Sequence, residues 1–221
     1  MREPIVYQLM HRLVDISVKH NLGHLGSCLT TLPILFDIYS KKGVDDKVVL
    51  SNGHAGLALY VVLEHFYGVD AEQLLVKHGI HPDRDIDNYI DVATGSLGLG
   101  ITVATGIAVG NKNITVHCVI SDGECAEGSI WESLRFISDS NVENITIHCN
   151  INGWSAYQSV DCDKLEKRLK SFLENVVIHK TDVSELLSWK HELAAHYTSA
   201  NNDILTELKN KIKEIVNAQS N

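Results

Sequence analysis

A carboxylate and an amide near the ends of two apolar runs are the side chains best placed to do chemistry. Asp122 follows the run 115–120, and Asn152 comes shortly after the run 145–149. Carboxylate and amide oxygens are hard ligands, suited to Mg²⁺ or Ca²⁺ and poorly suited to zinc. Because two such ligands cannot fill an octahedron, Mg²⁺ bound in this way completes its shell with phosphate oxygens and water. The two residues therefore predict a diphosphate bound through a divalent ion.

The elements around these two residues are expected to bring them together. Both runs are apolar and β-branched, as in strands buried on both faces, and Ile130, Leu134 and Ile137 predict a helix between them. A strand–helix–strand unit is a right-handed crossover between parallel strands, which places Asp122 and Asn152 at the same carboxyl edge of the sheet. Open α/β sheets bind their ligands at that edge.

The glycine after each of these residues has two interpretations. Gly123 lets the backbone come close to a phosphate, and the helix that begins just beyond it offers free N–H groups. Asp-Gly and Asn-Gly are also common turn dipeptides, and either one taken alone favours a plain turn. Their joint position at one edge of the sheet favours the binding site.

Three histidines lie in loops beside predicted helices. His24 stands between two glycines, His54 opens a helix, and His81 precedes a proline in the irregular segment 78–85. Taken alone, His24 is more readily explained as a local capping group, and His54 can be explained as a surface histidine at a helix N-terminus. The glycine-rich segment 94–100 follows no strand and lacks the spacing of a dinucleotide-binding fingerprint.

The remaining periodicity predicts an α/β fold of three layers, a mostly parallel sheet with helices on both faces. No linker or charge block divides residues 1–221, so we expect one domain. The predicted helices cover 5–19, 54–67, 101–110, 165–173 and 204–216, with others through Leu32 to Tyr39 and from about Gly128, and the predicted strands cover 47–50, 115–120, 145–149 and 175–180.

Composition excludes several classes of partner. The chain has 19 basic and 28 acidic residues and a net charge of −9, which disfavours nucleic acid and anionic membranes. The longest apolar run, 55–63, is too short to span a bilayer, and the N-terminus lacks the shape of a signal peptide. Five cysteines without zinc-type spacing indicate reduced thiols and a cytoplasmic protein.

Two further groups of histidines bear a superficial likeness to metal sites. The segments Thr-Val-His-Cys at 115–118 and Thr-Ile-His-Cys at 146–149 echo each other. We interpret them as two similar buried strands, because neighbouring residues of a strand point to opposite faces. His191 and His196 are one residue too far apart to share a helical face in the way a zinc-protease helix requires.

Several motifs together resemble the diphosphate-binding half of transketolases. The pattern Asp-Gly-Glu-x-x-Glu-Gly-x-x-Trp-Glu at 122–132, with Asn-Gly at 152–153, resembles the thiamine-diphosphate motif of that family. Four other segments follow the family's order: Gly-His-x-Gly-Ser at 23–27, Ser-x-Gly-His-Ala at 51–55, His-Pro-Asp at 81–83 and Thr-Gly-Ser-Leu-Gly-x-Gly at 94–100.

The resemblance implies a diphosphate-binding domain of the thiamine-diphosphate type that holds thiamine diphosphate through Mg²⁺ or Ca²⁺. The implied metal ligands are Asp122, Asn152 and the backbone carbonyl of Trp154. The residues implied to contact the cofactor are His54, Gly95, Leu97, Asp122, Gly123 and Asn152.

The resemblance also implies catalytic roles. His24, His54 and His81 would form hydrogen bonds and transfer protons at the sugar carbonyl and hydroxyls. Glu127 and Glu132 match glutamates that lie at the family's dimer interface and link two cofactor sites through a proton network, although both are equally compatible with exposed helix carboxylates. The implied reaction is the transfer of a two-carbon ketol unit from a ketose to an aldose, with sugars or sugar phosphates as substrates.

One catalytic group of the family has no place in this chain. A glutamate against N1′ of the cofactor promotes the tautomer that deprotonates thiazolium C2. In the family this glutamate belongs to a pyrimidine-binding domain, and the chain ends before such a domain could begin. The resemblance therefore implies a split transketolase, in which this N-terminal subunit pairs with a C-terminal subunit that carries the glutamate, and two such pairs form a heterotetramer.

Departures from the family pattern leave two alternatives open. Ser121 and Ile80 replace glycines, the part after about 155 is shortened, and a late histidine near the diphosphate has no clear counterpart. One alternative is half of another thiamine-diphosphate enzyme, a 2-oxoacid decarboxylase or a deoxyxylulose-phosphate-type synthase. The other is a non-catalytic regulatory or binding homologue, favoured by Ser121 and by the shortened C-terminal part.

Overall fold

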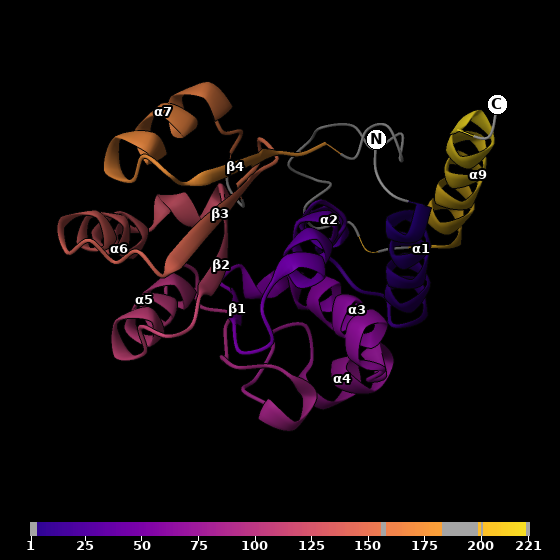
Figure 1. Ribbon diagram of the computed structural model, residues 1–221. Coiled ribbons are helices and arrows are strands. Elements are labelled where there is room, and N and C mark those ends of the chain that lie inside the picture. Colours follow the sequence, from indigo (N-terminus) through magenta and orange to yellow (C-terminus); the bar gives the residue numbers. More distant parts are fainter. Residues whose placement is uncertain (1–3, 156–157, 183–198, 200, 220–221) are drawn as a thin grey trace.

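The computed structural model describes residues 4–155, 158–182, 199 and 201–219, and confirms the predicted α/β class (Figure 1). Four parallel strands form one sheet in the order β1-β2-β3-β4, with helices on both faces. The strands are β1 (Lys47–Leu50), β2 (Val116–Ser121), β3 (Ile145–Ile151) and β4 (Val177–Lys180). The helices are α1 (Pro4–Lys19), α2 (Leu25–Lys41), α3 (Gly56–Tyr67), α4 (Ala71–His78), α5 (Gly100–Gly110), α6 (Gly128–Asp139), α7 (Cys162–Phe172) and α9 (Asn202–Gln219).

The register of the central strands confirms that Asp122 and Asn152 share one edge of the sheet. Ser121 pairs with Asn150, and both strands point the same way, so the next residues of each chain segment leave the sheet together. β1 ends at the same edge, which adds the loop after Leu50 to this region. The fold thus brings three loops, far apart in sequence, to one place.

Each face of the sheet is covered by its own set of helices. On one face, α5, α6 and α7 pack against a continuous apolar surface that includes Val116, Cys118, Ile120 and Ile147. On the other face, α2 lies against the sheet, and with α1, α3 and α9 packed beyond it forms a second core to which the strands contribute Val48, Leu50 and Val119. The alternation of side chains along each strand explains why successive residues enter different cores.

Some elements differ from the predicted ones. α4 was not predicted, because its pattern is short; Asp70 starts it by accepting hydrogen bonds from the N–H groups of Glu72 and Gln73. α6 begins at Gly128, as predicted, but a 3₁₀ turn that was not predicted, η3 (Gly123–Ala126), separates it from β2. His191 and His196 lie outside the described residues.

In the described part of the chain, no helix combines the length and the apolar composition that a membrane span requires.

Candidate cofactor-binding site

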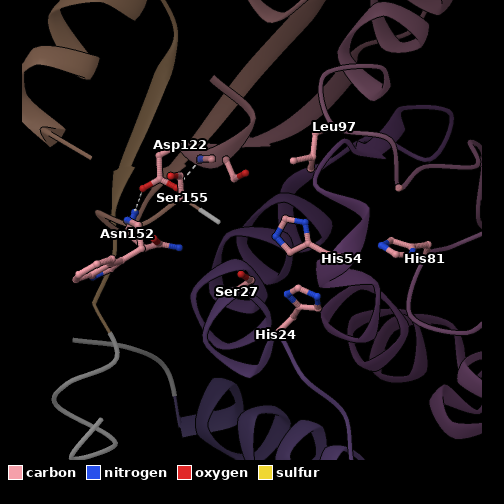
Figure 2. A pocket seen from close by; sticks show the side chains of 12 residues that line it. His24, Ser27, His54, His81, Leu97, Asp122, Asn152 and Ser155 are labelled. Carbon is pink, nitrogen blue, oxygen red and sulfur yellow. Dashed lines mark hydrogen bonds between the residues drawn. The ribbon is translucent and has the colours of Figure 1, made fainter. Parts of the chain in front are cut away.

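A cavity of about 260 Å³ lies at the carboxyl edge of the sheet. Figure 2 shows Asp122 and Asn152 on one side of it, and His24 and His54 across from them, with His81 beyond. The predicted site residues all line this cavity except Glu127 and Glu132. Its lining consists of His24, Ser27, His54, His81, Gly95, Leu97, Ser121, Asp122, Gly123, Asn152, Trp154 and Ser155.

Asp122 is held in place by backbone groups from both central loops. One carboxylate oxygen accepts a hydrogen bond from the N–H of Gly123 at 2.9 Å, and the other accepts from the N–H groups of Asn152 at 2.9 Å and Gly153 at 2.7 Å. The side chain is buried, and this burial raises the pKa of Asp122 to about 6, although the backbone donors oppose the shift. The carboxylate is therefore held in one orientation, and the backbone donors do not fully compensate the burial of its negative charge.

Asn152 and Trp154 form a tight turn next to Asp122, on the same side of the cavity. The amide oxygen of Asn152 accepts a hydrogen bond from the N–H of Trp154 at 3.0 Å, and Gly153 between them has a φ of 89°. Only glycine adopts that conformation without strain, which explains the Asn-Gly pair. The turn sets the carboxylate, the amide oxygen and the backbone after Asn152 around one corner of the cavity.

His24 and His54 lie close together at the N-terminus of α2. His24 precedes α2 and has a left-handed backbone with a φ of 58°, an uncommon conformation outside glycine. Its ring centroid lies 5.2 Å from that of His54. The thiol of Cys28, in the first turn of α2, donates a weak hydrogen bond to the backbone carbonyl of His54, so the two histidine segments are joined directly. Backbone strain of this kind is typical of functional sites.

His81 is positioned by two glycines in the neighbouring loops. Gly95 has a φ of 150°, and a Cβ at this position would lie 3.0 to 3.1 Å from the ring of His81. Gly56, at the start of α3, approaches the carbonyl of Ile80 so closely that a Cβ there would lie 2.2 Å from its oxygen. Ile80, which departs from the family pattern, therefore contributes to the position of this loop through its backbone carbonyl.

Glu124 is a site residue that the sequence did not reveal. It is fully buried, and one carboxylate oxygen accepts hydrogen bonds from the hydroxyl of Ser51 at 2.8 Å and the N–H of Gly98 at 2.9 Å. The other accepts from the N–H of Ser121 at 3.2 Å. Burial raises the pKa of Glu124 to about 7. The carboxylate joins the loops after β1 and β2 to the loop that carries Leu97; its place directly after Asp-Gly was the available signal.

Glu127 and Glu132 do not reach the cavity. Both side chains are exposed, one before α6 and one in its first turns. The structure therefore separates them from the other predicted site residues. A role for them requires something that covers this surface.

The donor set fits a hard divalent cation. No cluster of three or more His, Cys, Asp or Glu side chains in the described residues could hold a metal. A site built from Asp122, the amide oxygen of Asn152 and a backbone carbonyl is of another kind, with oxygen ligands only. Asp122 forms no ion pair with a described residue, so a cation would supply the charge that its burial lacks. These residues fit Mg²⁺ with a diphosphate.

Comparison with known proteins identifies relatives along most of the chain. Residues 5–186 match the family model described as "Transketolase, thiamine diphosphate binding domain". Transketolase-like protein 2 of Mus musculus is 36% identical over 141 residues, which are 55% of this chain and 22% of that protein. Transketolase of Pongo abelii is 36% identical over 136 residues, with 52% of this chain and 22% of that protein covered.

Solved transketolase structures share the fold. The enzyme of Campylobacter jejuni superposes with a TM-score of 0.73 at 20% identity, over 96% of this chain and 43% of that one. A transketolase of Pichia stipitis in complex with fructose 6-phosphate gives a TM-score of 0.77 at 18% identity, over 95% and 40% of the two chains. The chain thus spans less than half of the proteins that it resembles.

Proposed function

Since this chain belongs to the family of the transketolase thiamine diphosphate binding domain, we propose that it is the N-terminal subunit of a two-chain transketolase. The observation that carries the proposal is the single cavity in which Asp122 and Asn152 face His24, His54 and His81. Such a cavity offers a diphosphate anchor on one side and groups for a polyhydroxylated substrate on the other.

The anchor is formed by the loops after β2 and β3. Asp122, Asn152 and the backbone carbonyl of Trp154 bind Mg²⁺ or Ca²⁺, while Gly123 admits the diphosphate to the backbone. His54, Gly95 and Leu97 line the same cavity and contact the remainder of thiamine diphosphate. When bound, this cofactor supplies the electron sink for carbanion chemistry.

The histidines act on the sugar. His24 and His81 donate hydrogen bonds to substrate hydroxyls, and His54 holds or moves a proton at the sugar carbonyl. Ser27, in the first turn of α2, lines the same cavity and adds a further hydroxyl. The reaction that we propose transfers a two-carbon ketol unit from a ketose, or its phosphate, to an aldose.

A partner supplies the second half of the site. No glutamate is among the residues that line the cavity, so the group that promotes cofactor ionisation comes from elsewhere, and we propose a C-terminal subunit with the pyrimidine-binding domain. Exposed residues of α5, α6 and the segments before them suit such a partner: Leu99, Val103 and Phe136 are apolar and exposed, Glu127 and Glu132 are exposed as well, and α5 contacts α6. Two such pairs would form a heterotetramer.

The same proposal includes the domain organisation of the chain and its cellular compartment. Residues 1–221 would form one diphosphate-binding domain whose part after about 155 is shortened. All five cysteines are free thiols, which supports a reducing, cytoplasmic setting.

The partner is tested by gentle purification of the chain from its native cells, followed by mass spectrometry. The proposal expects a stoichiometric second chain with a pyrimidine-binding domain. A chain that comes out alone, with no such domain in its own intact mass, would contradict the two-chain enzyme and favour the non-catalytic alternative. A screen of ketoses against pyruvate with the purified complex then separates transketolase from decarboxylase or synthase activity.

The anchor is tested with Asp122→Ala and Asp122→Asn in that complex, and with Asp139→Ala as a surface control. Asp139 is exposed on α6. Calorimetric titration with thiamine diphosphate and Mg²⁺ should show binding for wild type and Asp139→Ala, and no binding for either Asp122 variant. Unchanged affinity in a folded Asp122 variant would refute the site assignment.

A further inference from the structure

Three histidines form a continuous row across the sheet, on the face that α2 covers. Nδ1 of His117 on β2 lies 3.3 Å from Nε2 of His148 on β3. Nδ1 of His148 lies in turn 3.2 Å from Nε2 of His179 on β4. Both separations fall within hydrogen-bonding range for ring nitrogens. We call these three residues the histidine row.

The register of the parallel strands explains the row. His117 pairs with Thr146, and His148 stands two residues further along β3. His148 pairs with Val177, and His179 again stands two residues further along β4. Since a shift of two residues returns a side chain to the same face, all three rings meet on one diagonal of the sheet.

A carboxylate stands at one end of the row. Oδ2 of Asp46, in the loop before β1, lies 4.0 Å from Nε2 of His117. The same carboxylate accepts hydrogen bonds from the N–H groups of Gly43 and Thr115, so its position is fixed by the backbone. Asp46 thereby favours a proton on Nε2 of His117 and gives the row a direction.

The histidine row can take up one additional proton and stay closed. Each gap between two rings takes one N–H, and each outer nitrogen can carry another, which makes four places for protons. Three neutral imidazoles bring three protons, so one more can be taken up if tautomers shift along the row. A second added proton must place two N–H groups face to face at 3.2 or 3.3 Å, and the row must open.

The surroundings resist charge on the row. Burial lowers the pKa of His148 to about 3, with the neighbouring rings adding to the shift, and burial also lowers the pKa values of His117 and His179. The charged groups that face the row from the packed elements are Asp37 of α2, which opposes the shift at His148 and His179, and Asp46 and Lys42 beside His117. Asp37 is itself paired with Lys41.

α2 rests on this same polar face through further hydrogen bonds. The amide of Asn150, two residues beyond His148 on β3, donates to the hydroxyls of Thr30 at 3.0 Å and Thr31 at 3.2 Å. The amide of Asn52 also donates to Thr31, at 3.2 Å, which links the seating of α2 to the loop of His54. The first turn of α2 carries Ser27 into the cavity, three residues after His24.

We propose that the histidine row makes the seating of α2 on the sheet, and with it the position of His24 and Ser27, dependent on pH. Above about pH 6.5 the imidazoles are neutral and the row is closed. Acidification beyond the first added proton opens the row and loosens α2 from β3. The inference does not depend on thiamine diphosphate, since it concerns the packing of this chain alone.

The test is hydrogen–deuterium exchange of α2, measured on the full chain without cofactor at about pH 7.5 and about pH 5 and corrected for intrinsic exchange rates. Exchange over α2 should become about thirtyfold faster at the lower pH, relative to α5, which packs on the apolar face; thirtyfold is the factor for the roughly 1.5 pKa units between an ordinary histidine pKa and pH 5. In His148→Gln, which cannot be charged, this pH dependence should disappear.

Two further histidine variants test whether the pH dependence of exchange over α2 comes from the histidine row. His65→Gln removes an exposed histidine of α3 and should behave as wild type. His179→Gln, at the half-buried end of the row, gives a second test if His148→Gln does not fold at about pH 7.5. Equal protection of wild-type α2 at both values of pH, or the same pH dependence in His148→Gln and His179→Gln as in wild type, would overturn the proposal. Neither result bears on cofactor binding, which is tested separately at Asp122.

Discussion

The two faces of the central strands are built from different chemistry. On the face toward α5 and α6, β2 and β3 present Cys118, Ile120 and Ile147, all buried and apolar. On the face toward α2, the same strands present the apolar Val119 together with His117, His148 and Asn150, which form directional hydrogen bonds. Apolar burial is non-directional and does not depend on protonation, whereas each hydrogen bond here depends on where a proton lies. One face therefore holds the sheet together under all conditions, and the other can respond to them.

The difference matters because the cavity draws on both faces. Asp122 and Asn152 leave the ends of β2 and β3, so their positions depend on the sheet itself. His24 and Ser27 arrive with α2, so their positions depend on the polar face. The anchor side of the cavity should then be more robust than the histidine side.

The largest effect is expected from a cavity in the apolar face. Ile147 lies in the middle of β3 and is almost fully buried, so Ile147→Ala should lower the free energy of unfolding by about 2–5 kcal/mol. Urea titration followed by circular dichroism measures the loss. Thr146→Ala, the next residue and on the opposite face, should cost less. A loss in Ile147→Ala no greater than in Thr146→Ala would show that the two faces do not differ as argued.

A somewhat smaller effect is expected at the centre of the polar face. Asn150→Ala removes the donors to Thr30 and Thr31 and the acceptor for the hydroxyl of Thr181. Breaking such a buried hydrogen-bond set costs about 1–3 kcal/mol. Urea titration gives the cost, and hydrogen exchange should place it in α2 and leave α5 unchanged. Uniform loss of protection across both helices would mean that Asn150 supports the whole sheet.

The apolar face was the predictable one. Periodicity identified the strands and the crossover helix, and from them followed the shared edge of Asp122 and Asn152. The rule that neighbours on a strand point to opposite faces correctly separated His117 from Cys118. Whether His117 meets His148 depends on the register between strands, which no local pattern encodes.

The same reason explains what was missed at the site. Glu124 belongs to the site because it accepts hydrogen bonds from Ser51 and Gly98. Both residues are far away in sequence, and the residues next to Glu124 do not predict these contacts. α4 was missed because one short helix has too few turns for a clear pattern, although Asp70 before it is a favourable cap. Asp122 and Asn152, in contrast, directly follow the ends of β2 and β3, where local sequence and fold agree.

The free energy of unfolding should depend on pH through the polar face and not through the apolar face. The folded pKa of His148 is lowered by burial below its unfolded value of about 6.5, so the unfolded chain binds more protons. The contribution of His148 to stability is thus complete above about pH 6.5 and is lost as the pH falls toward its folded pKa. Between about pH 6.5 and pH 5 this loss reaches about 2 kcal/mol.

Urea titrations across that range measure the slope. His148→Gln should show a flatter profile than wild type, whereas Ile147→Ala should lie below wild type by the same amount at every pH. A profile for His148→Gln parallel to that of wild type would assign the acid sensitivity to other groups.

The smallest effect is expected outside both faces. Arg135 and Asp139 on α6 form an ion pair at 2.9 Å, one helical turn apart, and both side chains are 61% exposed. Water and salt screen such a pair, so Arg135→Ala should change the free energy of unfolding by no more than about 0.5 kcal/mol. Urea titration at low and high salt provides the measurement. Because Asn150 is buried and this pair is not, a loss in Arg135→Ala as large as that in Asn150→Ala would mean that burial does not set the value of polar contacts in this protein.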